Sequence, residues 1–397
     1  MPQMLRKSLI RPAFIAAIVF FSPAAFAQSS GSVGQGVPAF EVRQGYRVTL
    51  AAQNFGAARH MELDDKGTLF VSQPAAGKVV ALSDKDGDGV YETKADFITD
   101  YKQAHSMAFK DGWLYVTSAD DGSCRRARDS DGDGKADDTE VFLPPGSVPA
   151  KGGHPFRGIA INDKHVFITV SDPGNISPDL PSENKSIYRF DRDGKNKTQW
   201  ATGLRNTEKI RFRPGTDELW GIDHGSDNFG KPYGETGGNQ PITDLIPGEE
   251  LNHYVEGGFY GHPFLSNQRI VRPEYATRPD IIELAAKTIP PAWNFGPHWA
   301  GNGFAFLEKD HFPDHKGDLI AAFHGSWNST TRVGYRIERV LFDKQTGLPY
   351  GALRLVGTLG DDPSKPLARP VDCVEAADGT ILFSCDRTNK IFRIAKE

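Results

Sequence analysis

The stretch HSMAFKDGWLYVT at residues 105–117 decides the fold, because five further versions of it occur along the chain. In each version a polar residue precedes a short apolar strand, a turn follows, and a second strand ends near Ser, Thr or Asp. The other versions are HMELDDKGTLFVS (60–72), RGIAINDKHVFITV (157–170), EKIRFRPGTDELWGI (208–222), NGFAFLEKDHFPDHKGDLIAAF (302–323) and DCVEAADGTILFS (372–384). Lys-Gly, Asp-Gly or Pro-Gly pairs supply the turn in four of the six.

Six copies of such a β-meander predict an all-β protein, a six-bladed β-propeller. A β-sandwich and a β-solenoid are the alternatives, but a sandwich needs no six like units and solenoid repeats are shorter. We expect the propeller to span residues 46–397, with a long insertion at about 223–291 and a flexible N-terminal segment at 28–45. The last strand, NKIFRIAKE, and the segment from about Tyr46 are expected to close the ring.

The first 27 residues read as a signal peptide. Basic residues precede a short apolar run at Ala13–Phe21, and Ala25–Ala27 fits a small-x-small cleavage site. The run is too short to span a bilayer, although an uncleaved anchor is the alternative. The mature chain is therefore expected to be periplasmic or secreted after cleavage near Ala27, without a membrane span.

The composition restricts the classes of function. The 397 residues carry a formal net charge of only −5, which argues against nucleic acid or an anionic membrane as a partner. Three cysteines, Cys124, Cys373 and Cys385, leave at least one free thiol, and they form no zinc or haem motif. A two-residue hairpin loop at Asp378-Gly379 would pair Cys373 with Ser384, so a disulfide to Cys385 needs a different loop.

The polar residue at the start of each repeat points to the functional site. His60, His105, Arg157, Glu208 and Asp372 hold this place. Because the first strand of each propeller blade lines the central channel, these side chains should ring one mouth of it, and convergent polar groups in a concavity indicate a ligand site.

Two acidic loops predict calcium. In DSDGDGKADDTE the candidate ligands Asp129, Asp131, Asp133, Asp137 and Glu140 fall at positions 1, 3, 5, 9 and 12 of an EF-hand loop. These sites look structural because they lie in turns between strands.

An earlier copy, DKDGDGVYE, has Asp84, Asp86, Asp88 and Glu92 but lacks an acid at position 12. Ordinary acidic turns are the alternative for both loops.

Several longer motifs resemble the soluble quinoprotein sugar dehydrogenases, the glucose/sorbosone dehydrogenase family. They are GLRNTEKIRFRPGTDELWGIDHG (203–225), EELNHYVEGGFYGHPF (249–264), FHGSWNSTTRVGYRIERVLFD (323–343), RPVDCVEAADGTILFSCD (369–386) and GGHPFRGIAI (152–161). The last three are similar to the sorbosone and pyranose dehydrogenase branch, and the resemblance runs from about residue 46 to the end.

The resemblance implies that pyrroloquinoline quinone (PQQ) binds over the channel with a Ca²⁺ on the quinone, and that an aldose or related alcohol is oxidised. It implies His154 as the general base and Gly225 and Ser226 as carbonyl ligands of the calcium. The cofactor contacts it implies or suggests are Arg157, Arg205, Asn206, Arg369, His105, His224 and Arg332. His224 stands where the soluble glucose dehydrogenases have Gln, and Arg332 is the nearest candidate for a lysine found there.

The residue types suit this chemistry. Arginine pairs with carboxylates in a planar, bidentate way, a Ca²⁺ polarises a carbonyl, and histidine suits proton removal from a hydroxyl near neutral pH.

Alternatives remain at this stage. One is a Ca²⁺-dependent lactonase-type hydrolase, against which the His- and Arg-rich strand starts argue. Another is a non-catalytic propeller that binds carbohydrate or protein. For a dehydrogenase the partners would be a sugar and a separate electron acceptor, a cytochrome or a quinone.

Overall fold

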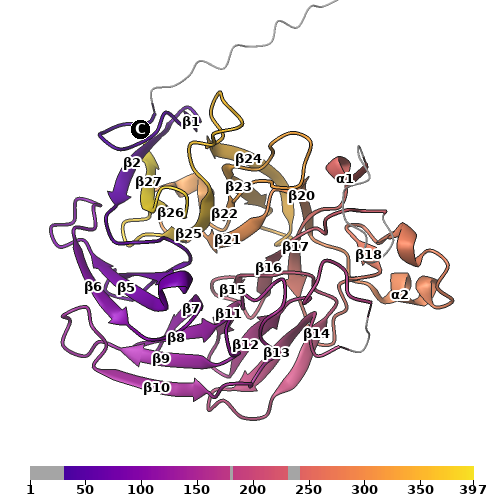
Figure 1. Ribbon diagram of the computed structural model, residues 1–397. Coiled ribbons are helices and arrows are strands. Elements are labelled where there is room, and N and C mark those ends of the chain that lie inside the picture. Colours follow the sequence, from indigo (N-terminus) through magenta and orange to yellow (C-terminus); the bar gives the residue numbers. More distant parts are fainter. Residues whose placement is uncertain (1–30, 179–181, 231–241) are drawn as a thin grey trace, which may run out of the picture.

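Each repeat folds as one antiparallel sheet, and the six sheets stand in a ring (Figure 1). The computed structural model describes residues 31–178, 182–230 and 242–397, and the predicted six-bladed β-propeller is confirmed within them. The predicted signal peptide at residues 1–27 lies outside the described residues.

Blades one to three run outward from the channel in chain order. Blade one consists of β3 (Met61–Leu63), β4 (Leu69–Gln73), β5 (Lys78–Ser83) and β6 (Thr93–Ile98). Blade two consists of β7 (Ala104–Lys110), β8 (Trp113–Ser118), β9 (Cys124–Arg128) and β10 (Asp138–Leu143). Blade three consists of β11 (Ile159–Ile161), β12 (His165–Val170), β13 (Ser186–Asp191) and β14 (Thr198–Thr202).

Blade four is interrupted. It consists of β15 (Ile210–Phe212), β16 (Leu219–Asp223), β17 (Gly248–Tyr254) and β20 (Trp293–Pro297). The segments between these strands hold α1 (Ile242–Leu245), the hairpin β18 (Leu265–Ser266) and β19 (Ile270–Val271), and α2 (Ile281–Lys287). The expected insertion at about 223–291 therefore contains a blade strand. Its sequence GEELNHY shows no apolar alternation because its buried side chains include Glu249, Glu250 and Asn252.

The two chain ends close the ring. Blade five consists of β21 (Gly301–Phe306), β22 (Leu319–Phe323), β23 (Arg336–Phe342) and β24 (Pro349–Gly357), and blade six has β25 (Pro370–Glu375), β26 (Ile381–Cys385) and β27 (Lys390–Lys396). Its fourth strand is β2 (Tyr46–Ala52), which pairs with β27 as predicted. Within the segment expected to be flexible, β1 (Glu41–Val42) pairs with β24 and extends blade five.

Single 3₁₀ turns occur at Pro74–Ala76, Pro273–Tyr275 and Pro313–His315. No helix in the described part of the chain has the length and apolar character to cross a membrane.

Apolar side chains fill the spaces between neighbouring blades. Trp220 and Ile222 of blade four, for example, pack with Phe304, Phe306 and Phe323 of blade five. Burial of one such aromatic side chain contributes about 1.5–3 kcal/mol. The polar residues at the channel therefore lie on strands that are held in place by packed apolar side chains.

The hairpin of blade six corrects one prediction. The amide of Ala376 donates to the carbonyl of Thr380, so the loop has three residues, and Gly379 takes its left-handed position with φ of 80°. The register moves by one, and Cys373 faces Phe383 rather than Ser384. All three cysteines are buried free thiols.

Candidate functional site

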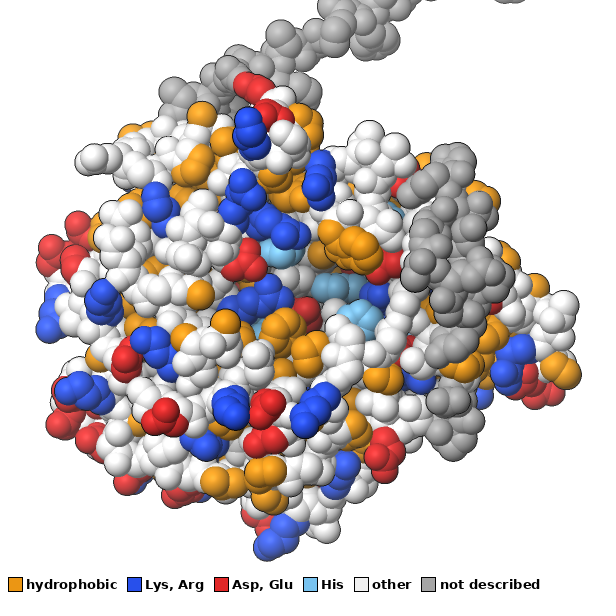
Figure 2. Space-filling view, in the orientation of Figure 1, with side chains coloured by type: hydrophobic (Ala, Val, Ile, Leu, Met, Phe, Trp, Pro, Cys, Tyr) orange, Lys and Arg blue, Asp and Glu red, His pale blue; other side chains and the backbone are white. Residues whose placement is uncertain are grey.

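The polar residues that start the inner strands converge in the channel, as the repeat predicted. His60, His105, Arg157, Glu208 and Asp372 are each at most 6% exposed. Figure 2 shows histidine side chains gathered at the centre of one face, among basic and acidic groups.

His154 lies in the loop that leads to β11. Its Nδ1 donates to the carbonyl oxygen of Asp172 at 2.8 Å, which fixes the proton on Nδ1. Nε2 has no hydrogen-bond partner among the residues that the structure describes. Burial and the neighbouring Arg205 lower the pKa of His154 to about 3, so the ring is neutral near pH 7 and presents a free acceptor nitrogen.

Arg157 holds this loop in place. Its guanidinium donates to the carbonyl oxygens of Pro149 (3.0 Å), His154 (2.8 Å) and Phe156 (3.1 Å). Burial lowers its pKa to about 10. These contacts hold the backbone around His154, and the cofactor contact predicted for Arg157 stays a prediction.

Arg205 and Asn206 are positioned by one carboxylate. Asp223, at the end of β16, accepts the backbone amides of Arg205 (2.8 Å) and Asn206 (2.7 Å). The side chain of Asn206 donates to Nδ1 of His224 at 3.1 Å, and Nε2 of His224 donates to the carbonyl of Gly301, also at 3.1 Å. Asn206 Oδ1 is buried without a partner among the described residues.

A small cavity lies beside these residues. Gly225, Ser226, Arg205 and Arg272 are among its lining residues, and so is Glu250. Burial and the charge of Asp223 raise the pKa of Glu250 to about 8, so it is mostly uncharged at pH 7. Asp223 lines the cavity as well, and each guanidinium group already pairs with a carboxylate, Arg205 with Asp227 at 3.5 Å and Arg272 with Glu274 at 2.9 Å.

Gly225 and Ser226, whose carbonyls are the predicted calcium ligands, both line this cavity. A Cβ on Gly225 would lie 2.6 Å from the carbonyl oxygen of Pro247, so only glycine fits there. In the described ranges, neither carbonyl oxygen of the pair accepts a hydrogen bond. Ser226 Oγ accepts from Arg272, a cation that the sequence analysis missed.

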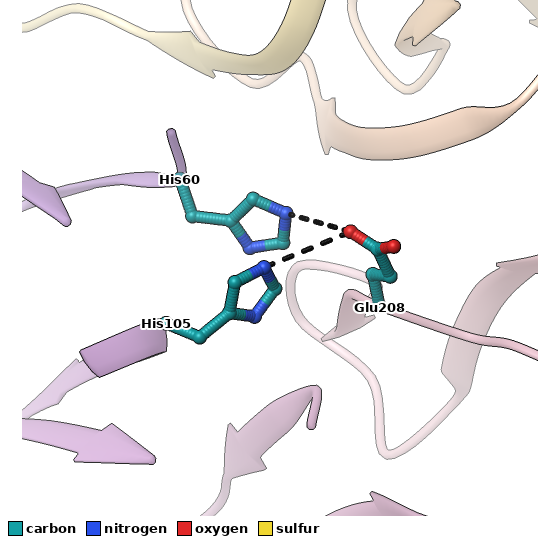
Figure 3. Close-up of side chains that lie close together, drawn as sticks. All are labelled: His60, His105 and Glu208. Atoms are coloured by element: carbon teal, nitrogen blue, oxygen red, sulfur yellow. Dashed lines mark ion pairs between the residues drawn. The ribbon is translucent and has the colours of Figure 1, made fainter. Parts of the chain in front are cut away.

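A second group of three side chains lies in the channel. Figure 3 shows His60 and His105 pointing toward Glu208, whose Oε2 is 4.0 Å and 3.6 Å from their Nε2 atoms. The ring of His105 stacks on Phe156 with 4.0 Å between centroids. The Nδ2 atom of Asn206, 3.5 Å from Glu208 Oε1, connects this group to the cavity.

The two remaining arginines are held by blade five. Arg369 donates to the carbonyls of His324 (3.2 Å) and Gly325 (3.1 Å), and the exposed Arg332 donates to that of Ser326 (2.8 Å). Among the described residues, neither Arg369 nor Arg332 contacts His154 or Arg205. The cofactor contacts predicted for these two arginines therefore stay predictions.

Three channel partners were missed although the repeat signals them. The second strand ends in or is followed by an Asp in three copies: Asp172, Asp223 and Asp386. Asp172 accepts from His262 at 2.7 Å, and Asp386 accepts from His324 at 3.0 Å and from Arg59 at 3.2 Å. An aspartate at or just after the end of the second strand recurs in these three repeats, and this pattern could have predicted the three residues from the sequence.

The two acidic loops share one conformation. Asp84 accepts the amides of Gly87 and Gly89, each at 2.8 Å, and Asp129 accepts those of Gly132 and Gly134 at 2.6 and 2.8 Å. The loops join the outer strands of blades one and two, away from the channel.

The oxygen atoms in each loop are close enough for one ion. Asp84, Asp86, Asp88 and Glu92 form one group, and Asp129, Asp131 and Asp137 form the other. Two predicted ligands of the second loop lie outside its group: Glu140 pairs with Arg126 at 2.6 Å, and Asp133 with Lys135 at 3.6 Å.

Calcium is expected to stabilise the blades through these loops. A free Ca²⁺ concentration of 100 times Kd adds about 2.7 kcal/mol per occupied site, so EGTA should lower the Tm. Asp129→Asn with Asp131→Asn should remove part of that shift, measured by differential scanning fluorimetry. Asp65→Asn, at an exposed turn, is the control, and an equal EGTA effect in both variants would contradict the prediction for this loop.

The low pKa of His154 makes stability depend on pH. Between pH 6.5 and about 3 the unfolded chain binds a proton at this residue that the folded chain does not, so stability falls as pH falls. The slope from one such group is at most about 1.4 kcal/mol per pH unit. We expect urea unfolding of His154→Gln to show a shallower loss from pH 6.5 to pH 4 than wild type. Parallel curves would mean that His154 is protonated in the fold.

Comparison with known proteins supports the fold and the family resemblance. The model of the TrAA12-like family matches residues 177–397, and a domain of unknown function (DUF7133) matches residues 32–258. An uncharacterized protein of Borreliella burgdorferi is 26% identical over 375 residues, which is 88% of this chain and 94% of that one.

Two solved structures have the same architecture. The calcium structure of the Trichoderma reesei carbohydrate-active enzyme of family AA12 matches with a TM-score of 0.76 at 19% identity, over 90% of this chain and 97% of that one. The holo form of the pyranose dehydrogenase PQQ domain from Coprinopsis cinerea matches with a TM-score of 0.76 at 18% identity, over 92% and 99%. At these identities the likeness shows the fold.

Proposed function

Because the chain belongs to the TrAA12-like family, we propose that it is an oxidoreductase that binds PQQ at the channel mouth and oxidises an aldose or a related alcohol. The carrying observation is the hydrogen bond from His154 Nδ1 to the Asp172 carbonyl at 2.8 Å, which leaves Nε2 as the acceptor nitrogen of the ring. The pyranose dehydrogenase domain of C. cinerea binds PQQ on the same fold, which supports the proposal.

The residues at the cavity fit such a cofactor. Arg205 and Arg272 place two buried guanidinium groups there, each of which already pairs with a carboxylate of the chain, Asp227 at 3.5 Å and Glu274 at 2.9 Å. The carbonyls of Gly225 and Ser226 offer oxygen ligands to a Ca²⁺, and Asn206 adds a buried amide oxygen without a partner in the described part of the chain. When bound, PQQ supplies the two-electron acceptor for the oxidation.

The chain's own residues supply the proton chemistry. Nε2 of His154 accepts the proton of the substrate hydroxyl, while Nδ1 stays hydrogen-bonded to the Asp172 carbonyl. Asp172 is itself fixed, because its carboxylate accepts from His262 and from the amides of Gly174 and Ser177. Arg157, in the same loop ahead of β11, donates to the carbonyls of His154 and Pro149 and so fixes the backbone around His154.

The predicted signal peptide supports a periplasmic or secreted location for the mature enzyme. The electron acceptor would then be a separate protein or quinone, and the substrate a soluble sugar.

Reconstitution tests the proposal. The purified mature chain is mixed with PQQ and Ca²⁺, cofactor retention is followed by absorbance after gel filtration, and dye reduction is followed with a panel of aldoses and alcohols. We expect stoichiometric PQQ and substrate-dependent dye reduction. A folded chain that retains no PQQ would overturn the proposal.

A further inference from the structure

We propose that His60, His105 and Glu208 bind one divalent transition-metal ion of the Zn²⁺ class inside the channel, separate from any calcium at Gly225 and Ser226. One ligand atom from each residue lies within 4.8 Å of the other two. The site belongs to three different blades, since the three residues precede or begin the inner strands β3, β7 and β15 (Figure 3).

The distances need only a small contraction. Zinc–nitrogen and zinc–oxygen bonds of about 2.0–2.2 Å place tetrahedral ligand atoms about 3.3–3.5 Å apart. Here Glu208 Oε2 is 3.6 Å from Nε2 of His105 and 4.0 Å from Nε2 of His60. Modest side-chain rotation brings all three atoms to bonding distance without moving a strand.

Unpaired nitrogens identify the centre as a ligand site. His60 and His105 are 1% and 0% exposed, and none of their four ring nitrogens has a hydrogen-bond partner within the described ranges. A buried polar atom without a partner costs about 1–3 kcal/mol. A metal bound to both Nε2 atoms would satisfy two of the four nitrogens at once.

The cations around the site are balanced by carboxylates. Arg59 is the guanidinium nearest to the site, and it faces two carboxylates, Glu208 at 2.8 Å and Asp386 at 3.2 Å. Nearby cations have carboxylates of their own: Lys209 pairs with Asp372, and Arg211 with Glu62. Arg157, a further cation near His105, contacts carbonyl oxygens rather than a carboxylate, so the four carboxylates around the site balance its four cations.

Arg59 and the metal would share Glu208. Arg59 donates to Oε2, the oxygen nearest to the histidines, while Oε1 has only the 3.5 Å contact from Asn206. Because Arg59 already contacts Asp386, it keeps a partner if Glu208 turns toward the ion.

The donor set selects the metal class. Two imidazoles and one carboxylate suit Zn²⁺, Co²⁺ and Fe²⁺, whereas Ca²⁺ and Mg²⁺ require oxygen ligands. Three protein ligands leave a fourth position open. That position is available to water or to a small ligand in the channel.

Cobalt titration of the PQQ-free protein tests the site. Co²⁺ bound by this set gives a visible d–d band, and we expect one Co²⁺ per chain, displaced by Zn²⁺. Loss of a residue that only hydrogen-bonds a metal ligand already costs about 10–100-fold in affinity. Loss of a ligand itself, in Glu208→Gln or His105→Gln, should therefore weaken binding by at least about 100-fold. His165→Gln, on a half-buried histidine of blade three near Asp191, is the matched control and should bind as wild type does.

Two results would overturn the assignment: no d–d band in the wild type, or equal affinity in Glu208→Gln, His105→Gln and wild type. Circular dichroism checks that each variant is folded. If a variant does not fold, X-ray absorption of the Zn²⁺-loaded wild type decides, because the site requires two imidazoles and an all-oxygen shell excludes it. PQQ is absent throughout, so this test can fail while the proposed dehydrogenase function stands, and the reverse also holds.

Discussion

His154→Gln is expected to lower kcat for the substrate alcohol by about 10²–10⁴-fold, the range that a positioned general base contributes. Glutamine can keep a hydrogen bond to the Asp172 carbonyl, which His154 makes at 2.8 Å, but it cannot take up a proton. Because residue 154 does not line the cavity of Arg205 and Arg272, PQQ affinity should stay near that of wild type. Single-turnover dye reduction and a PQQ titration measure the two quantities separately.

His253→Gln is the matched control for this experiment. His253 stacks on Trp220 with 4.9 Å between centroids, on a strand that is not the innermost of its blade. This variant should retain wild-type kcat. Full activity in His154→Gln would remove the base role, and a loss of PQQ binding would reassign His154 to the cofactor.

Lys209→Met is expected to destabilise the fold by about 3–5 kcal/mol, since it leaves a buried carboxylate without its cation. Lys209 and Asp372 have side chains only 3% and 0% exposed and pair across the channel, with Nζ 2.6 Å from Oδ1. Asp372 also accepts the amide of Met61 at 2.8 Å. The pair therefore links blades one, four and six.

Urea unfolding of two further variants tests the interpretation. Lys209→Met with Asp372→Asn removes both charges and should recover much of the loss. Lys110→Met breaks the exposed pair with Asp163 and should cost less than about 1 kcal/mol. If the single variant at Lys209 loses no more than Lys110→Met, the channel pair contributes nothing beyond a surface pair.

The fold was predictable because the repeat encodes it locally. Each copy carries its apolar strands and four of the six carry a Gly-containing turn pair, so blade number and ring closure followed from the sequence. The third strand of blade four did not, because β17 carries buried acids whose partners, such as Asn267, lie outside the repeat.

The candidate site was predictable in part. The strand starts located His60, His105 and Glu208, and a family resemblance singled out His154, Arg205 and Asn206. Their partners depend on contacts between distant parts of the chain: His262 and Asp172 are 90 positions apart, and Lys209 and Asp372 are 163 apart. No local pattern reports such pairs. Glu140 has a loop spacing that fits calcium, but its place on a strand pairs it with Arg126, and the spacing alone does not report that pair.

The closure of blade six determines when the ring can form during synthesis. β2 comes from the beginning of the chain and its partner β27 from the last residues, Lys390–Lys396. During synthesis, five blades emerge before the strand that closes the ring exists, and pairing over such a sequence distance is slow. The ring is thus closed only in chains that contain β27. A chain without β27 keeps every residue of the site, but it lacks the pairing of β2 with β27 that closes the ring around those residues.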